Sequence, residues 1–323
     1  MKEITCVIPT LSYHKEMLER AVDGRAAINY IDSKIIELRD IKNSEIMLGN
    51  IPLNVVNSCT SLKWLQLSTA GSDTYAAPGI LPKGCTLTNA SGAFGLAIAE
   101  HMIGTLLEIY KKLHYYRDNQ NNSLWQDEGS VETIEGKTVL VVGLGDIGST
   151  FARKMKALGA HIIGIRRTAQ KCPEYVDELY MPEMLDKLLP QADIVALSIP
   201  QTPQTDKLFS RERIALMKER SVLINVGRGS AVDTEALCDA LESGKLLGAS
   251  LDVTDPEPLP AEHRIWKIRN AVVTPHISGF FHLRETHDRI ISIAAQNITR
   301  YFEGKPLINT VDMNTGYRRS DGN

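Results

Sequence analysis

Short apolar runs alternate with stretches of helical spacing along the first hundred residues. The runs "ITCVIP", "SEIMLG", "LKWLQLS" and "CTLTNA" are bounded by Pro, Gly, Asn or Ser, as strands commonly are. Between them, stretches such as "HKEMLERAVDG" have apolar positions at helical spacing and end at glycine. This alternation predicts an α/β fold in which helices cover a parallel sheet.

The same alternation restarts at Lys137 and is more regular there. We expect strands at "KTVLVVG", "AHIIGI", "ADIVALSIP", "SVLINVG", "LLGASLDV" and "NAVVTP". Helices are expected at "DIGSTFARKMKALG", "EMLDKLLPQ", "RERIALM" and "DTEALCDALESG". A series of such units is typical of a doubly wound parallel sheet.

The segments between and after the two series predict how the chain divides. "GAFGLAIAEHMIGTLLEIYKKLHYYRDNQ" is expected to form one long helix, and the polar "NNSLWQDEGS" a boundary loop. A last helix, residues 283–303, lies beyond the final strand, and we expect it to cross back to the first domain. The predicted domains are therefore a discontinuous one, 1–98 plus 287–323, and an inserted one, 99–286.

Length, charge and cysteine content narrow the class of protein. The chain has 323 residues, enough for two domains, and a net charge of -3, which gives no reason to expect a nucleic acid or a membrane as partner. The five cysteines are scattered and form no C-x-x-C pair, so neither a metal site nor a disulfide framework is indicated. No signal segment and no apolar run of about 18 residues is visible. These features predict a cytoplasmic protein.

A glycine-rich turn, "VVGLGDIGS", joins an expected strand to an expected helix. Gly143 permits a tight turn, Gly145 lets the backbone approach a diphosphate, and Gly148 allows close packing of helix on strand. The helix N-terminus adds N–H groups that bind phosphate oxygens. The spacing and its context indicate a dinucleotide site; the alternative is a tight turn that binds no ligand.

The stretch "HIIGIRRTAQ" bears on the choice of dinucleotide. About 20 residues after the glycines, an acidic side chain usually binds the adenosine ribose of NAD. Here that position holds Arg166, followed by Arg167 and Thr168. A guanidinium would bind the 2′-phosphate of NADP through charge-assisted hydrogen bonds. We therefore expect NADP(H) as preferred cofactor, with NAD(H) as a second one; the alternative is two solvated surface arginines.

Three further segments place polar side chains where expected strands end. "INVGRGSAVDTEAL" carries Arg228 between two glycines, which suggest close approach of a ligand. "ASLDVTDPEP" carries Asp252 and Glu257, and "NAVVTPHISG" carries His276. In α/β proteins, ligands bind beyond the carboxyl ends of the strands. These four side chains are therefore candidates for catalysis or binding.

Together, the glycine turn, "NVGRGSAVD", "LDVTDPEP", "TPHISG" and the closing "NTVDMNTGY" resemble the D-isomer-specific 2-hydroxyacid dehydrogenase family, over nearly the whole chain. The resemblance implies a Rossmann nucleotide domain inserted into a discontinuous, flavodoxin-like substrate domain, with the active site in the cleft. It also implies a homodimer formed mainly through the nucleotide domains and the long helix near Glu100.

The resemblance also implies roles for the candidate residues. Arg228 would hold the carboxylate of a 2-keto acid and polarise its carbonyl, and His276 would protonate the developing alkoxide. Glu257 would orient His276 and favour its protonated form. Asp252 is assigned to cofactor positioning or to support of the site. The other seven histidines are expected to be structural or on the surface.

In the first domain, "LSTAGSDTY" resembles the substrate loop of the family, with Ala70 and Gly71 at the matching positions. Their backbone amides would bind the substrate carboxylate. After His276 the chain continues with bulky residues, Phe280, Phe281 and His282. These residues either line a substrate pocket or cover the start of the last helix, and the sequence leaves both alternatives open.

The combined prediction is an oxidoreductase that transfers a hydride between NADP(H) and a 2-keto or 2-hydroxy acid of D configuration, acting as a keto acid reductase. The alternatives are an NAD-dependent dehydrogenase for a larger keto acid and a non-catalytic, nucleotide-sensing dimer. The expected cofactor-binding residues are Gly143, Gly145, Asp146, Ile147, Gly148, Arg166, Arg167, Thr168, Ile199, Pro200, Val226, Gly227, Asp252 and Gly279.

Overall fold

The computed structural model describes residues 2–168 and 171–313, which form two compact units. The first unit comprises residues 1–94 and 281–323, and the second comprises residues 95–280. The limits of these compact units differ by a few residues from the predicted domain limits. The domain limits themselves stay a prediction. The end of "HIIGIRRTAQ" (169–170) and the end of "NTVDMNTGY" (314–317) lie outside the described residues.

The first unit is built on a five-stranded sheet in which all neighbouring strands are parallel. Its order is β2-β1-β3-β4-β5, which is the flavodoxin-like order. The strands are β1 (Lys2–Cys6), β2 (Ala26–Tyr30), β3 (Ile46–Leu48), β4 (Trp64–Gln66) and β5 (Thr86–Thr88). The helices are α1 (Ser12–Val22), α2 (Leu38–Ile41), α3 (Leu53–Val56), α4 (Asp73–Ala76) and α11 (Arg284–Phe302).

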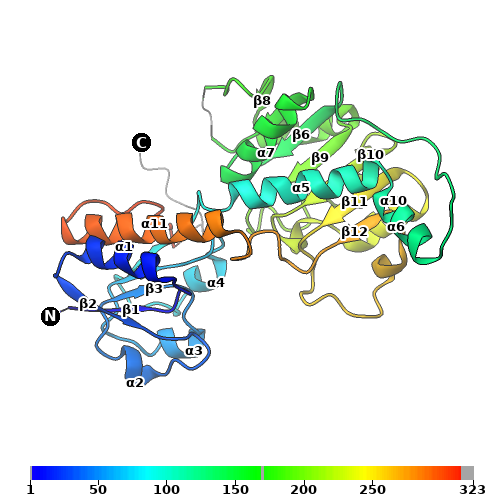
Figure 1. Ribbon diagram of the computed structural model, residues 1–323. Helices are drawn as coiled ribbons and strands as arrows, with labels where there is room; N and C mark the ends of the chain where they lie inside the picture. Colours follow the sequence, from blue (N-terminus) through cyan, green and yellow to red (C-terminus); the bar gives the residue numbers. More distant parts are fainter. Residues whose placement is uncertain (1, 169–170, 314–323) are drawn as a thin grey trace. The chain divides into compact units, whose positions relative to one another are not determined.

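The last helix, α11, packs against α1 within the first unit (Figure 1). Leu18 and Val22 of α1 are buried, as are Ile291 and Ile298 of α11. Since the chain reaches α11 only after the whole second unit, the first unit is assembled from two distant stretches of sequence. The apolar faces of the two helices supply the burial that holds these stretches together.

The second unit contains a seven-stranded parallel sheet of order β12-β11-β10-β9-β6-β7-β8. The crossover between β6 and β9 reverses the strand order, as in a Rossmann fold. The predicted class, two doubly wound α/β sheets of Rossmann and flavodoxin-like type, is confirmed. The strands are β6 (Thr138–Val142), β7 (His161–Ile165), β8 (Glu178–Tyr180), β9 (Ile194–Leu197), β10 (Ser221–Asn225), β11 (Leu246–Leu251) and β12 (Ala271–Val273).

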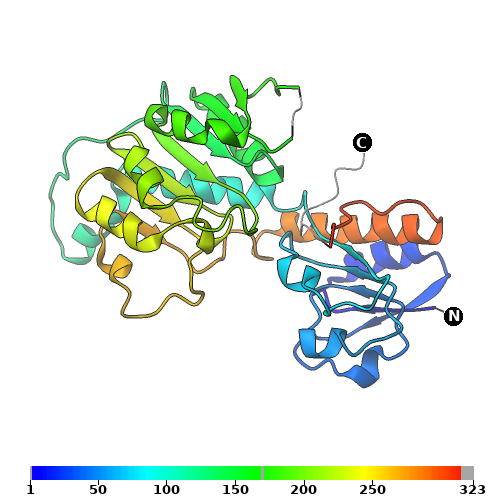
Figure 2. The same ribbon diagram turned by 180° about the vertical axis from the view of Figure 1, so that it is seen from behind.

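Helices cover both faces of this sheet (Figures 1 and 2). On one face, α5 (Gly95–Tyr110) packs beside α7 (Asp146–Ala157) and contacts β10 and β11. On the other, apolar side chains of α8 (Leu185–Leu188), α9 (Arg211–Leu216) and α10 (Thr234–Glu242) join a large core cluster. The remaining helices are α6 (Leu113–Asn121), η1 (Pro182–Met184), η2 (Leu189–Gln191), η3 (Gly229–Ala231) and η4 (Arg264–Lys267).

The prediction of one long helix over "GAFGLAIAEHMIGTLLEIYKKLHYYRDNQ" is wrong, because the helix is interrupted between α5 and α6. Lys112 has a φ of 54°, in the left-handed region, which ends the regular hydrogen bonding of α5. The Nζ atoms of Lys111 and Lys112 donate to the backbone carbonyls of Glu132 and Glu128, respectively. These contacts hold the interruption in place.

Within the described residues, no helix is both long and apolar enough to cross a membrane.

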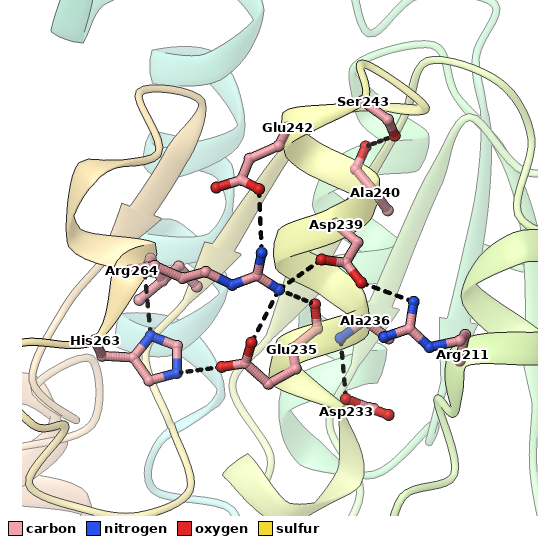
Figure 3. A network of polar contacts seen from close by, with 11 residues as sticks. Arg211, Asp233, Glu235, Ala236, Asp239, Ala240, Glu242, Ser243, His263 and Arg264 are labelled. Carbon is pink, nitrogen blue, oxygen red and sulfur yellow. Dashed lines mark hydrogen bonds and ion pairs between the residues drawn. The ribbon is translucent and has the colours of Figure 1, made fainter.

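A charged network ties η4 to α10 (Figure 3). Arg264 lies 2.9 Å from Glu235, 2.6 Å from Asp239 and 3.1 Å from Glu242, all on α10. Hydrogen bonds from Arg264 and Arg211 hold the pKa of Asp239 below its ordinary value. Single surface ion pairs add little stability, but several carboxylates on one guanidinium fix its position. The network therefore anchors the end of the loop that follows β11.

Candidate active site

The three glycines after β6 have three different surroundings. Gly143 has a φ of +99°, and a Cβ there would lie 2.8 Å from the carbonyl oxygen of Ser198. A Cβ on Gly148 would collide with the carbonyl oxygen of Gly143, so helix and turn touch there. Gly145 is exposed, and a Cβ on it would meet no atom within 4 Å. Its backbone is open to a ligand at the N-terminus of the twelve-residue helix α7, so the loop fits a dinucleotide diphosphate.

Asp146, the first residue of α7, has its carboxylate bound elsewhere in the unit. Its Oδ2 accepts a hydrogen bond of 2.8 Å from the backbone N–H of Gly95, the first residue of α5. A carboxylate is well placed at a helix N-terminus, where unpaired N–H groups gather. The side chain thus joins the starts of α5 and α7. For Asp146 and the half-buried Ile147, the groups available to bind a phosphate are therefore the backbone N–H groups.

Arg166, Arg167 and Thr168 directly follow β7, at the carboxyl end of the sheet. Arg166 is half-buried, and Arg167 and Thr168 are exposed.

At the other end of β7, His161 Nε2 lies 2.8 Å from a carboxylate oxygen of Glu178. Hydrogen bonds from Tyr180 and His161 hold the pKa of Glu178 below its ordinary value.

The remaining expected cofactor residues follow the carboxyl ends of three other strands of the same sheet. Ile199 and Pro200 follow β9, Val226 and Gly227 follow β10, and Gly279 lies beyond β12. Since parallel strands end at one edge, the sheet presents these positions along the same side as the glycine loop.

The loop that carries Arg228 is held from within. The buried Asn225 accepts a 3.1 Å hydrogen bond from the N–H of Gly227 and donates one of 2.9 Å to the carbonyl of Arg228. The Arg228 side chain, half-buried, donates to the carbonyl of Gly227 at 2.8 Å. The two glycines that flank Arg228 are required by close backbone contacts, which is a different reason from the ligand approach expected from the sequence. A Cβ on Gly227 would lie 2.5 Å from the carbonyl oxygen of Ile199, and one on Gly229 would collide with that of Thr254.

His276 and Glu257 are brought together from segments 19 residues apart. Nδ1 of His276 lies 3.0 Å from Oε2 of Glu257, and the other carboxylate oxygen accepts from the N–H of Thr254 at 3.0 Å. An ionised carboxylate only accepts, so Nδ1 carries the proton and Nε2 is the nitrogen left for other chemistry. The imidazole is half-exposed, and the residue has a φ of 53°. A left-handed backbone in a non-glycine residue is uncommon and needs support from its surroundings.

Asp252 supplies that support. Its carboxylate, 1% exposed, accepts hydrogen bonds from the N–H groups of Ile277 (3.0 Å) and Ser278 (3.1 Å), and from the hydroxyls of Ser278 and Thr274. Its backbone carbonyl accepts from the N–H of His276 at 2.8 Å. Asp252 therefore organises the turn that carries His276.

Three residues near Asp252 escaped the sequence analysis, namely His101, Thr274 and Ser278. Nε2 of His101 on α5 lies 3.2 Å from the Thr274 hydroxyl and 4.0 Å from Asp252. The only local signal was a hydroxyl residue two positions on either side of His276. His101 is 173 residues from Thr274, and nothing in the chain around it announces this contact.

In the first unit, two asparagines hold the predicted substrate loop. Asn50 accepts a 3.0 Å hydrogen bond from the N–H of Ser68, and Asn89 donates one of 2.8 Å to the carbonyl of Ala70. The hydroxyl of Thr69 donates to the carbonyl of Gly71 at 2.9 Å. The loop is therefore shaped by side chains at the carboxyl ends of β3 and β5, which the sequence analysis did not single out.

The bulky residues after His276 differ in their surroundings. The ring of Phe281 lies 5.1 Å from that of His287, in the first turn of α11, with an edge-to-face geometry. This contact favours the second alternative for Phe281, that it covers the start of the helix. Phe280 is 51% exposed and keeps the other alternative open.

Comparison with known proteins agrees with this architecture. The sequence model "D-isomer specific 2-hydroxyacid dehydrogenase, NAD binding domain" matches residues 103–278. A glyoxylate reductase of Thermofilum pendens is 31% identical over 283 residues, covering 83% of this chain and 81% of that protein.

Two solved structures extend the likeness to nearly the whole chain. A D-isomer specific 2-hydroxyacid dehydrogenase family protein of Aeromonas salmonicida has a TM-score of 0.87 at 29% identity, covering 97% of this chain and 99% of that one. An NADPH-dependent glyoxylate/hydroxypyruvate reductase of Sinorhizobium meliloti, in complex with NADP and sulfate, has a TM-score of 0.78 at 26% identity, covering 98% and 100%. The chain therefore belongs to the D-isomer specific 2-hydroxyacid dehydrogenase family and is an NAD(P)-dependent oxidoreductase that acts on CH–OH groups.

Proposed function

We propose that the protein reduces a small 2-keto acid to the D-2-hydroxy acid with NADPH as preferred reductant. The observation that carries the proposal is the 3.0 Å contact between His276 and Glu257. It leaves Nε2 of an oriented imidazole to exchange a proton with a substrate. The named relatives that reduce glyoxylate or hydroxypyruvate favour a small substrate.

The proposal gives the substrate carboxylate and carbonyl to Arg228. A guanidinium stays protonated and binds two oxygens at once, so it both holds the acid and withdraws electrons from its carbonyl. In the first unit, the backbone N–H groups of Ala70 and Gly71 are assigned to the carboxylate as well. That loop is shaped by Asn50, which accepts from the N–H of Ser68, and by Asn89, which donates to the carbonyl of Ala70.

His276 is assigned as the general acid. As negative charge develops on the substrate oxygen, Nε2–H of the imidazolium transfers its proton to that oxygen, and Glu257 stabilises the cation until transfer. When bound, the dihydronicotinamide supplies the hydride. The proton that His276 gives up goes to the alcohol oxygen, and the neutral imidazole is reprotonated from solvent.

The residues that would hold the dinucleotide are those at the carboxyl edge of the second unit's sheet. Gly145 and the first turn of α7 would bind the diphosphate, and Arg166, Arg167 and Thr168 the 2′-phosphate of NADP. The other assigned contacts are Gly143, Asp146, Ile147, Gly148, Ile199, Pro200, Val226, Gly227, Asp252 and Gly279.

Replacement of Arg166 by Asp should reverse the cofactor preference. The variant presents a carboxylate to the 2′-phosphate, so we expect the KM for NADPH to rise about 10- to 100-fold, as for loss of one charge-assisted pair. The KM for NADH should change little or fall. Steady-state kinetics with both cofactors measure this, and Arg220→Asp is a matched control because Arg220 precedes β10 at the opposite edge of the sheet. An unchanged KM for NADPH would reduce Arg166 to surface charge.

The remaining parts of the proposal concern organisation. The proposed domains are residues 1–98 with 287–323 and residues 99–286. The proposed assembly is a homodimer formed mainly through the nucleotide domains, and the proposed compartment is the cytoplasm. Size-exclusion chromatography with light scattering tests the dimer directly.

The central experiment follows the loss of NADPH or NADH absorbance with glyoxylate, hydroxypyruvate, pyruvate and branched or phenyl-substituted keto acids. Faster turnover with NADPH on a small acid supports the proposal. Faster turnover with NADH on a larger acid would replace it by an NAD-dependent dehydrogenase. Cofactor binding without turnover on any acid would indicate a nucleotide sensor instead.

A further inference from the structure

A line of partly buried polar contacts runs from the middle of α5 to the turn that carries His276. It begins at Nε2 of His101, 3.2 Å from the hydroxyl of Thr274. That hydroxyl lies 2.6 Å from Oδ1 of Asp252, which also accepts from the N–H of Ile277. All of these residues belong to the second unit. The line connects a helix on one face of the sheet with the backbone next to His276.

Simple counting of protons gives the line a direction. A threonine hydroxyl has one proton, and an ionised carboxylate can only accept. The proton of Thr274 therefore goes to Asp252, and its oxygen must accept from His101. This assigns the proton of the His101 ring to Nε2. Each group donates toward Asp252, so every hydrogen bond strengthens the next.

Burial makes this arrangement rigid. The side chain of His101 is 16% exposed and that of Asp252 is 1% exposed, so water competes weakly for these contacts. In such surroundings, loss of one donor leaves polar groups that cannot easily find another partner. The Asp252 carboxylate is thereby fixed in the orientation that receives the N–H groups of Ile277 and Ser278.

The backbone of His276 depends on that orientation. With a φ of 53°, it occupies a region that costs a non-glycine residue free energy and persists only when its neighbours impose it. The N–H groups of the next two residues are held by Asp252, and that of His276 itself by the Asp252 carbonyl. A loosened Asp252 would let the turn relax and shift the imidazole away from its working position.

We propose that His101 is a positioning residue for the reduction, acting on His276 through Thr274 and Asp252. The inference rests on the role of His276 in the proposed function. His101 itself touches neither His276 nor Glu257 in this assignment. Its role is to hold the His276 imidazole in a position that the backbone at residue 276 would not keep if the turn relaxed.

The test compares three variants. His101→Leu removes the donor, and His101→Gln keeps an N–H donor of similar reach. Thr105→Val is the matched control, one turn further along α5. It removes the buried 2.8 Å hydrogen bond between Thr105 and Ser250 of β11, together with hydrogen bonds to the backbone carbonyls of His101 and Met102, and leaves the His101 ring unchanged. The bond to Ser250 also joins α5 to the sheet, but it leads to no residue of the His276 turn. A merely structural role for His101 predicts the same behaviour for the His101→Leu and Thr105→Val variants.

Two readouts separate positioning from general loosening. Amide hydrogen exchange over residues 274–280, measured without cofactor, should speed up about tenfold in His101→Leu and stay unchanged in Thr105→Val. The kcat for reduction of a keto acid should fall about tenfold, because small displacements of a catalytic group are costly, while the KM and the Kd of NADPH stay within about twofold. His101→Gln should restore most of both.

Thr274→Val tests the same line if His101→Leu folds poorly. It should reproduce both effects, and the double variant should be little worse than either single one, since the two act as a unit. Additive effects, or effects of His101→Leu no larger than those of Thr105→Val, would overturn the inference. If His276→Ala keeps full turnover, the proposed function fails instead, and the exchange measurement still decides whether His101 orders the turn.

Discussion

We expect the His276→Ala variant to lose about 10²–10⁴-fold in turnover, the usual contribution of a single general acid. The reason is local: the 3.0 Å contact with Glu257 orients one imidazole whose Nε2 is left to donate. Without it, the developing alkoxide must take its proton from water. The diphosphate is assigned to the glycine loop after β6 and not to His276, so the Kd of NADPH should remain within about twofold.

Single-turnover reduction monitored by NADPH absorbance, together with fluorescence titration of NADPH, measures both quantities. His263→Ala is a suitable control, because His263 also lies near a carboxylate, 3.3 Å from Glu235, but in the network on α10. It should retain full turnover. Equal activities for the two variants would remove His276 from the mechanism.

The second large effect is expected from Asp252→Asn, which should lower the free energy of unfolding of the second unit by about 3 kcal/mol. Each carboxylate oxygen faces one backbone N–H, from Ile277 or from Ser278. An asparagine presents an oxygen to one of them and an NH₂ group to the other, whichever way it turns. The hydroxyls of Thr274 and Ser278 can rotate to accept, but a backbone N–H cannot, so one buried donor loses its partner.

Urea denaturation followed by tryptophan fluorescence and circular dichroism measures this loss. Asp255→Asn is the matched control, because it makes the same replacement three residues away on the exposed part of the loop. It should change the free energy of unfolding by less than about 0.5 kcal/mol. Similar midpoints for the two variants would show that the carboxylate of Asp252 is not needed to hold the turn. Turnover of Asp252→Asn should also fall, because the same N–H groups fix His276.

The sequence was sufficient where one residue type had one physical reason. Gly143 and Gly148 followed from the needs of a tight turn and a close helix, and the structure gives both glycines close backbone neighbours. Gly145 was expected to let a phosphate approach, and that role stays a prediction. Alternation of strands and helices predicted both sheets. The pairing of His276 with Glu257 came from the family resemblance, since their spacing alone does not place them in contact.

The sequence was insufficient where distant segments meet or where a short element lacks a pattern. His101, Asn225 and Asn50 act through hydrogen bonds to residues whose positions depend on the finished fold. Strand β8, "ELY", has three half-buried residues at the edge of its sheet and so shows no apolar run. The interruption at Lys112 rests on side-chain contacts to Glu128 and Glu132, which no helix periodicity can reveal.

Two glycines of the loop after β6 differ in what their surroundings require. Gly148 is required by the chain itself, because any side chain there would strike the backbone of Gly143. A Cβ on Gly145 would meet no atom within 4 Å, so packing does not require glycine there, whereas the proposed diphosphate would. A descendant that abandoned the dinucleotide would be free to change residue 145 and still fold, whereas residue 148 would remain fixed. If Gly145 binds the diphosphate as proposed, residue 145 is constrained by the cofactor and residue 148 by the packing of the fold.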